Sequence, residues 1–465
     1  ENKMNKITRR LAALGLAATM VGSLAACGGN SSDTQTAACG DNVTIKFTWW
    51  GNQSRHDYTQ KILDKYTELH PNVKFEAIPA GWDGYFDKLS TQAASGSMPD
   101  IVQMDYLYLT TYANNNSIAD LQPYVDDGTI DVSQIADNVV DAGKVDKKLA
   151  GIVGGTGTVA IGYNPEVFKE AGIEEPNQDG SAWTWDEFVE MAQKLTLDTE
   201  GRNAADPDFD ANNIKQYGVM FGTDWNVYMP FILSAGGGYL NESMDGLGLN
   251  DEKSAQILQN FADLINVYHV SPTAVQKNAM PSAATALAAK QTAMYIDGSW
   301  NHLDLMNSGC NWGVGVLPID ENYTTFFDGG SLIIFKSTKH LEASEKLYLW
   351  LTNPESSERI TELYRTLWMP VQTEYYTDPD KIDFWASEEL PARPEGFQDA
   401  IVKATYDHAV VATEINVKNF NEINTLVGSA LEQVWSGKKT AEEAMTEVKS
   451  QTDSLVEGTY SGERS

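Results

Sequence analysis

The amino-acid sequence predicts an α/β protein in which strands of a parallel sheet are flanked by helices. The first observation is the order of elements between Val43 and Asp105, which alternates strand, helix, strand, helix and strand. This alternation is typical of a parallel sheet with helices on its faces. The second observation is the length of 465 residues. At ~100–200 residues per domain, that length predicts two or three domains.

The first predicted strand runs from Val43 to Phe47, where apolar and polar residues alternate. On this period Trp50 lies on the face opposite Val43 and Phe47, and the chain then breaks at Gly51-Asn52. Apolar residues at helical spacing over 58–69 predict an amphipathic helix behind the break. Trp50 is therefore expected at the carboxyl end of a strand, where open α/β sheets bind ligands. An indole followed by amide, guanidinium and carboxylate groups suits a sugar, although tryptophans that cap a core would also explain this stretch.

The following segments complete the first sheet and lead into a second lobe. Strands are predicted at 73–77, 101–104, 217–221, 292–296, 312–317 and 332–335, and helices at 82–94, 164–172, 184–195, 228–234, 251–268 and 281–290, with mostly helix beyond 341. The glycine-rich segment 149–163 is interpreted as a crossover between lobes. It is not a dinucleotide-binding loop, because Ala160 stands where the third glycine is required.

The N-terminal residues have the pattern of a secretory signal. Basic residues precede an apolar run at 11–24, which ends at Leu24-Ala25-Ala26-Cys27. Residues 1–26 are therefore predicted to be a lipoprotein signal peptide, and Cys27 the lipidated first residue of the mature chain. A buried cysteine in an N-terminal helix is the alternative. Residues 27–41 are rich in Gly, Ser, Thr and Asn, which predicts a flexible tether.

The composition narrows the classes of partner. The formal net charge is −32, with 33 Lys and Arg against 65 Asp and Glu. Such a chain repels nucleic acid and anionic membrane surfaces, so neither is expected as a direct partner. Three cysteines are too few for a disulfide framework, and we expect no bond between Cys39 and Cys310.

Several short motifs occur in an order that is shared with one protein family. They are Trp49-Trp50-Gly51, Gly96-Ser97-Met98-Pro99-Asp100-Ile101, Tyr163-Asn164-Pro165, Thr184-Trp185-Asp186-Glu187, Ala293-Met294-Tyr295-Ile296-Asp297-Gly298-Ser299-Trp300, Val316-Leu317-Pro318, Asp328-Gly329-Gly330 and Met369-Pro370-Val371. With them, the chain resembles the family 1 extracellular solute-binding proteins of ABC transporters, the group that includes maltose-binding protein. The resemblance covers essentially everything after the tether.

This resemblance implies a two-lobed periplasmic-binding-protein fold of type II, in which each lobe is a mixed sheet flanked by helices. Lobe 1 would comprise 42–155 and 298–333, and lobe 2 would comprise 156–297 and 334–465. Crossings between the lobes are expected near 154–157, 297–298 and 331–335. The implied protein is a receptor and not an enzyme: a monomer without cofactors that binds an oligosaccharide between its lobes and delivers it to ABC permease subunits. Through Cys27 it would be held on the outer face of the cytoplasmic membrane, and the lipid anchor would be its one contact with the membrane.

The family's ligand positions carry over to this sequence one at a time. The residues implied in ligand binding are Trp50, Asn52, Gln103, Asp105, Trp225, Tyr239, Trp300, Asp328 and Trp368. Relatives often have an acid near Asn52, which makes that position uncertain. Trp82 is added because it follows a predicted strand and precedes a helix. Tryptophans at such strand ends can stack on a sugar or pack in the core.

Parts of the sequence are also compatible with three other interpretations. A secreted glycoside hydrolase would also be acidic and rich in aromatic residues, and would need two carboxylates that flank the scissile bond. A surface adhesin would require repeats or a wall anchor, and neither is visible. The segment Asp206–Asn212 has the alternating acids of a calcium loop. Ala211 replaces the required glycine and Tyr217 the bidentate acid, so no metal site is predicted.

Overall fold

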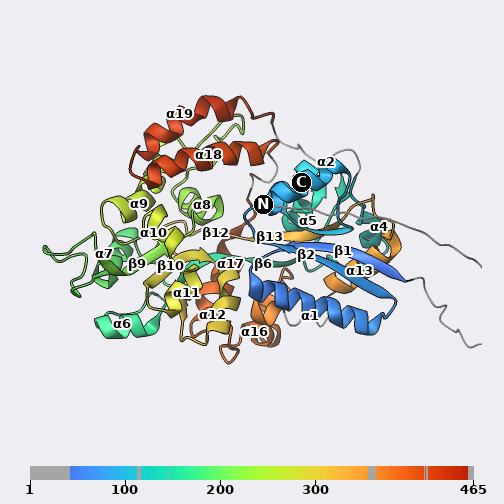
Figure 1. The fold of residues 1–465 in the computed structure, drawn as a ribbon, viewed down its shortest axis with the longest axis horizontal. Coiled ribbons are helices and arrows are strands. Elements are labelled where there is room, and N and C mark those ends of the chain that lie inside the picture. Colours follow the sequence, from blue (N-terminus) through green and yellow to red (C-terminus); the bar gives the residue numbers. More distant parts are fainter. Residues whose placement is uncertain are drawn as a thin grey trace, which may run out of the picture. The chain divides into compact units, whose positions relative to one another are not determined.

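A computed structural model describes residues 42–112, 117–145, 147–177, 179–353, 363–412, 414 and 417–458. The signal peptide, the tether, Cys27 and Cys39 lie outside the described residues. The remaining chain, 42–465, forms one compact unit that contains two five-stranded sheets (Figure 1). The predicted α/β class with two mixed sheets is thereby confirmed.

The first sheet has the strand order β2-β1-β3-β13-β6. Its strands are β1 (Val43–Trp50), β2 (Val73–Ala80), β3 (Ile101–Asp105), β6 (Val153–Gly157) and β13 (Asp328–Ile334). The strand β1 is parallel to both β2 and β3. Its pairing with β2 runs from Val43 opposite Val73 to Trp50 opposite Ala80. The strand β13 is antiparallel to β3 and β6, which makes the sheet mixed. The carboxyl ends of β1, β2 and β3 therefore meet at one edge.

Helices cover both faces of the first sheet. They are α1 (Gln53–Leu69), α2 (Tyr85–Ser95), α3 (Tyr106–Tyr112) and α13 (Leu341–Thr352). The alternation along β1 determines which face each ring occupies. The Trp49 ring lies 6.1 Å from that of His56 in α1, whereas the Trp50 ring lies 5.4 Å from that of Tyr85 in α2. These contacts confirm the prediction that Trp50 lies on the face of the sheet opposite to that of Val43 and Phe47.

The second sheet has the strand order β11-β7-β10-β9-β8. Its strands are β7 (Val159–Tyr163), β8 (Leu197–Asp198), β9 (Ile214–Phe221), β10 (Thr292–Gly298) and β11 (Gly313–Gly315). The strand β10 is parallel to β9 and antiparallel to β7. The carboxyl ends of β9 and β10 therefore share an edge.

The helices around the second sheet begin where the sequence places capping residues. They include α6 (Pro165–Ala171), α7 (Trp185–Leu195), α8 (Trp225–Ser234), α9 (Glu252–Asn266), α10 (Ala274–Ala279) and α11 (Ala283–Ala288). Thr184 and Glu187 form the predicted capping box at the start of α7. Asn164 caps α6, and Gly172 in the left-handed conformation ends it.

The remaining elements lie either between α3 and β6 or after β10 in the chain. They are η2 (Ser299–Asn301), α12 (His302–Ser308), α15 (Glu374–Thr377), α16 (Pro379–Ala386), the π-helix η3 (Gln398–Lys403), α17 (Ala404–His408), α18 (Phe420–Trp435), α19 (Ala441–Asp453), α4 (Gln122–Asp126), α5 (Asp137–Ala142) and the strand pairs β4 (Lys144–Val145) with β5 (Lys148–Leu149) and β12 (Thr325–Phe326) with β14 (Ala409–Val410). The helices α18 and α19 pack against α9. Among the described residues, none of the helices is long and apolar enough to span a membrane.

The path of the chain between the sheets differs from the expected path at 297–298 and at 331–335, where β13 leads to α13 on the same first sheet. The chain does pass from β6 to β7 at Thr158, as expected near 154–157. It does not cross at 297–298, because β11 returns to the second sheet and pairs with β7. The second crossing instead follows β12, at Phe327 before β13. As a result β11 belongs to the second sheet, although residues 298–333 were predicted to belong to lobe 1. In the same way α13 packs on the first sheet, although residues 334–465 were predicted to belong to lobe 2.

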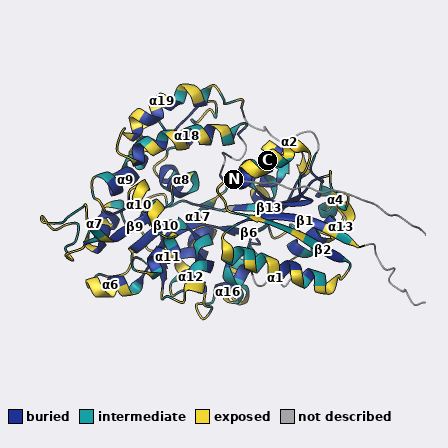
Figure 2. Cartoon of the chain, in the orientation of Figure 1, coloured by how far each residue is buried: buried dark blue, intermediate teal, exposed yellow. Residues whose placement is uncertain are grey.

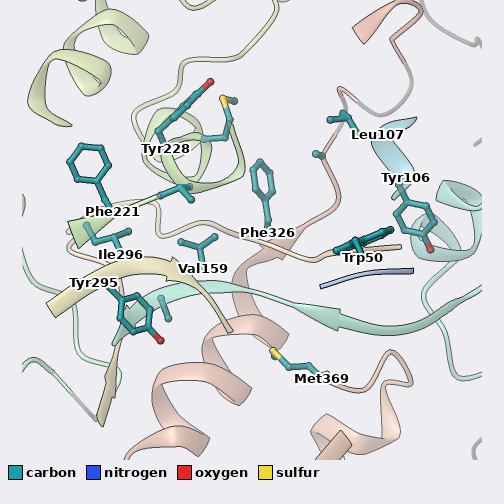
Figure 3. Close-up of a cluster of buried hydrophobic side chains, with 14 of the residues drawn as sticks. Trp50, Tyr106, Leu107, Val159, Phe221, Tyr228, Tyr295, Ile296, Phe326 and Met369 are labelled. Carbon is teal, nitrogen blue, oxygen red and sulfur yellow. The ribbon is translucent and has the colours of Figure 1, made fainter. Parts of the chain in front are cut away.

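The buried side chains form one large cluster that extends across both sheets. The inner strands of both sheets are largely buried, whereas the edge strand β2 and the outer faces of α1, α2 and α6 are partly exposed (Figure 2). Figure 3 shows Val159, Phe326 and Met369 between the side chains of the two sheets, with Phe221 and Trp50 on either side. Four tryptophans outside the predicted ligand set belong to this cluster or pack against it: Trp49, Trp185, Trp350 and Trp435.

Candidate functional site

Two tryptophans lie side by side at the carboxyl edge of the first sheet. Trp50 is the last residue of β1 and is 8% exposed. Its ring lies 5.2 Å from that of Trp82, edge to face, and also contacts the rings of Tyr85 and Phe86. Trp82, in the turn between β2 and α2, is 38% exposed. The buried ring thus supports an exposed ring, and an exposed indole held in this way is suited to stack on a flat apolar surface.

Tyr108 extends this aromatic surface, and the sequence analysis did not identify it. Its ring stacks on Phe86, with centroids 3.6 Å apart, and lies 6.3 Å from Trp82. Burial raises the pKa of Tyr108, and the nearby charges of Asp105 and Asp224 raise it further. The phenol therefore stays neutral at physiological pH. Its position on the short helix α3, directly after β3, is the signal that could have identified it.

The two predicted polar residues of β3 have structural partners. The Oδ1 atom of Asp105 accepts the backbone N–H of Leu107 at 2.8 Å, at the start of α3. Gln103 is 9% exposed, and its backbone oxygen accepts a hydrogen bond from the Tyr85 hydroxyl. The Gln103 side chain and Trp368 line two small cavities of about 20 and 30 Å³. Gln103 therefore lies near Trp368, one of the other predicted site residues.

Arg55 joins two of the predicted aromatic residues. Its guanidinium carbon lies 4.5 Å from the Trp368 ring centroid and 5.6 Å from that of Trp50. A cation at these distances is attracted to the ring faces. Two glycines make room for the stack: a Cβ on Gly51 would lie 2.6 Å from Arg55 Cδ, and one on Gly155 would lie 2.5 Å from Trp368 Cβ. Glycine therefore follows Trp50 because a side chain at position 51 would clash with Arg55.

Asn52, another predicted ligand residue, makes two side-chain hydrogen bonds within the protein. Its Oδ1 atom accepts the backbone N–H of Arg55 at 3.2 Å and caps α1. Its Nδ2 atom donates to Asp304 Oδ2 in α12. Burial raises the pKa of Asp304, and hydrogen bonds from Ser54 and Asn52 oppose that shift. The Asn52 amide therefore links the helix that follows β1 to the helix that follows β10.

The predicted residues associated with the second sheet occupy different environments. Trp225 is not on a loop as expected. It is the first residue of α8, half-buried, and its ring lies 5.3 Å from Phe326 and 5.9 Å from Phe420. Trp300, in η2, is half-buried and packs so closely on Gly298 that a Cβ there would lie 2.2 Å from its ring. Both rings lie next to the segments that join the sheets.

Tyr239 and Asp328 complete the predicted set. Tyr239 has no exposed surface, and its hydroxyl donates to Asn424 Oδ1 at 2.8 Å. The ring is part of the core beside Phe420. Asp328 is the first residue of β13, opposite Gly157.

The structure brings together Trp50, Trp82, Gln103, Asp105 and Trp368 around the edge of the first sheet, and separates Tyr239 from them. In the described part of the chain, no group of three or more His, Cys, Asp or Glu side chains is arranged to hold a metal ion. The acids of the 206–212 segment instead accept backbone N–H groups of their own turns, as Asp206 does from Asp208 at 2.9 Å. Cys310 is a free thiol.

Comparison with known proteins gives consistent matches over most of the chain. Residues 61–392 match the model of a family described as bacterial extracellular solute-binding protein. A galactooligosaccharide-binding protein of Bacillus subtilis is 22% identical, and the alignment covers 98% of this chain and 100% of that protein. A maltooligosaccharide ABC transporter solute-binding lipoprotein of Streptococcus pneumoniae is 24% identical over 80% of this chain and 82% of its own length.

Solved structures show the same fold. The ABC substrate-binding protein Lmo0181 from Listeria monocytogenes, in complex with cycloalternan, superposes with a TM-score of 0.75. It is 22% identical, with 89% of this chain and 99% of that chain covered. Maltose-bound MalE3 of T. maritima has a TM-score of 0.72 and 18% identity, with 89% and 100% covered. The two sheets therefore form the two lobes of this type of fold.

Proposed function

Since the chain belongs to the family of bacterial extracellular solute-binding proteins, we propose that it is the oligosaccharide receptor of an ABC importer. It binds its sugar between the two lobes and delivers it to the permease subunits. The relatives that match nearly the whole chain are named for galactooligosaccharide and maltooligosaccharide binding. No catalytic step is part of this function, so the sugar leaves the protein unchanged.

One observation carries the choice of a sugar as the ligand: the exposed Trp82 ring at the carboxyl edge of the first sheet. A pyranose has a face of C–H groups, and covering that face with an indole removes apolar surface of both partners from water. The ring keeps its orientation because Trp50, Phe86 and Tyr108 surround it. Asp105, at the end of β3 on the same edge of the sheet, offers a carboxylate as a hydrogen-bond partner for sugar hydroxyls.

A thermal-shift screen of oligosaccharides tests this function. A ligand at 100 times its Kd stabilises the protein by about 2.7 kcal/mol, which raises the melting temperature measurably. The best sugar is then measured by calorimetry against wild type and Trp82→Ala. Chromatography of the recovered sugar should show it unchanged, whereas a hydrolase would shorten it. Absence of a shift with every oligosaccharide would contradict the proposal.

The proposed location is the outer face of the cytoplasmic membrane, through a lipid on Cys27. The support is the sequence motif Leu24-Ala25-Ala26-Cys27 and the lipoprotein named among the relatives. Replacing Cys27 with Ala should release the protein into the medium or leave the signal peptide uncut. Unchanged membrane retention together with an unchanged N-terminus would rule out this anchor.

A further inference from the structure

A cavity of about 340 Å³ lies at the carboxyl ends of β9 and β10, where the segment 277–283 covers them. Its lining includes Phe221, Lys277, Asn278, Ser282, Asp297 and Asn301. Small-molecule sites have volumes of about 300–1,000 Å³ and few, convergent polar groups. The position also agrees with the general rule that open α/β sheets bind ligands beyond the carboxyl ends of their strands. None of the residues predicted from the sequence lines this cavity.

A carboxylate and an ammonium group lie in the cavity wall. The Oδ1 atom of Asp297 accepts the backbone N–H of Gly298 at 2.7 Å. The Nζ atom of Lys277 donates to the backbone oxygen of Phe221 at 2.7 Å, its one hydrogen bond among the described residues. A lysine ammonium has three N–H donors, so further donors are available. Burial lowers the pKa of Lys277 and raises that of Asp297 to about 6, while the attraction between the two opposes both shifts.

The segment that follows β9 joins this cavity to Trp225. Gly222 lines the cavity, and Trp225, three residues later, is the first residue of α8. Asp224 lies between them, is exposed, and makes no side-chain capping hydrogen bond. A sugar that contacts Trp225 is therefore close to the cavity, since three residues span at most about 10 Å.

We propose that the cavity is a second sugar subsite, in which Lys277 and Asp297 bind the hydroxyls of the end residue of a neutral oligosaccharide. This inference rests on the proposed function and adds that the ligand is a neutral oligosaccharide. Hydroxyls both donate and accept, so one sugar ring satisfies the ammonium and the carboxylate together. Asp297 lines the cavity together with Lys277, so its carboxylate repels a sugar that carries a carboxylate of its own.

The experiment combines chain length with substitution. Neutral gluco- and galacto-oligosaccharides of two to five residues, and the same sugars ending in a uronic acid, are titrated by calorimetry into wild type, Lys277→Met and Asn278→Ala. The exposed Lys194→Met in α7 is the matched control. Losing a charge-assisted hydrogen bond should weaken binding of the best neutral sugar by about 10- to 100-fold in Lys277→Met. Removing one sugar residue should weaken wild type by a similar factor and leave Lys277→Met nearly unaffected.

Each outcome decides the inference. Equal affinity of wild type and both cavity variants for every sugar length would overturn the subsite and leave the proposed function intact. Uronic acid sugars that bind wild type as tightly as neutral ones would also overturn it. If wild type binds none of the oligosaccharides, the proposed function fails and the subsite with it. Asn278 is exposed, so Asn278→Ala keeps the test valid if Lys277→Met does not fold.

Discussion

Trp225 has aromatic neighbours on both sides and a partly exposed ring, so it can bind a sugar, support the fold, or do both. We predict that Trp225→Ala weakens sugar binding about 30- to 150-fold, because losing an aromatic platform costs about 2–3 kcal/mol. Calorimetry with the best sugar measures the loss. Trp185→Ala is the control, since that ring packs against Phe188 and Phe261.

The two tryptophan variants should behave in opposite ways. Trp185→Ala should lower the melting temperature of the empty protein and keep its sugar affinity. If Trp225→Ala binds within about threefold of wild type while it melts much earlier, its ring serves only packing.

Asp297 makes the stability of the empty protein depend on pH. Burial raises its pKa from 3.8 to about 6. Because the folded-state pKa is the higher one, its stabilising contribution is complete below pH 3.8 and is lost as the pH rises through 6. Asp297→Asn removes the charge, so we expect it to be more stable than wild type at pH 7.5 by about 1 kcal/mol.

Thermal melts at pH 4.5, 6 and 7.5 measure this effect without any ligand. The advantage of Asp297→Asn should grow with pH, whereas Asp64→Asn, at an exposed position on α1, should show no such trend. An advantage that stays constant across this range would contradict the buried charge as its cause.

The start of α1 shows what one residue contributes to a whole element. Asn52→Ala removes the cap of α1 and the bond to Asp304, so we expect it to cost more than the about 1 kcal/mol of a typical cap. Asn52→Asp keeps a cap acceptor but places a second carboxylate beside Asp304. It should therefore be least stable near neutral pH and recover as the pH falls and the buried Asp304 is protonated.

Urea unfolding at pH 5 and 7.5 distinguishes these effects. Thr184→Ala is the matched control, because Thr184 caps α7 through Glu187 without a bond to another helix. Equal losses in Thr184→Ala and Asn52→Ala would show that the bond to Asp304 contributes nothing to stability.

Elements with local signals were predictable from the sequence. Capping residues and periodicity located α6 and α7, and alternation located β1, because these signals act within a few residues. The start of α8 was missed. Asp224 makes no side-chain capping bond there, and Trp225 is held by Phe326 and Phe420, both distant in the sequence.

The candidate site was predictable only where a motif marks a strand end. Trp50 and Trp82 lie at the ends of strands as expected, because their positions in the sequence just after predicted strands are enough to place them there. Tyr239 carries over from the family's ligand positions, but its ring is buried against Phe420 by tertiary packing, which no local signal marks. Lys277 belongs to α10, a helix that has no buried residue. The sequence of α10 therefore shows no hydrophobic periodicity that could have indicated where Lys277 lies.

For the whole molecule we predict closure on the sugar. A ligand that contacts both lobes favours the state in which both contacts are made, by the difference between its affinities for the two states. Small-angle scattering should therefore give a smaller radius of gyration with the best sugar than without it. Trp82→Ala at the same sugar concentration should keep the radius of the empty protein. An unchanged wild-type radius at saturation would argue against closure.

The assignment of segments to lobes could not be read fully from the sequence. A short strand such as β11 carries no information about its partner, and its pairing with β7 depends on the return of the chain after α12. The hydrophobic pattern locates a strand, whereas the neighbour is chosen by packing across the sheet.

The position of β13 between β3 and β6 also has a consequence for how the protein matures. β3 ends at Asp105 and β13 begins at Asp328, so the first sheet stays incomplete until most of the chain has been synthesised. Contacts this far apart in sequence form slowly, because a long loop must close before any of them stabilises the fold. The nascent chain therefore remains unfolded for longer than a chain with local pairing would.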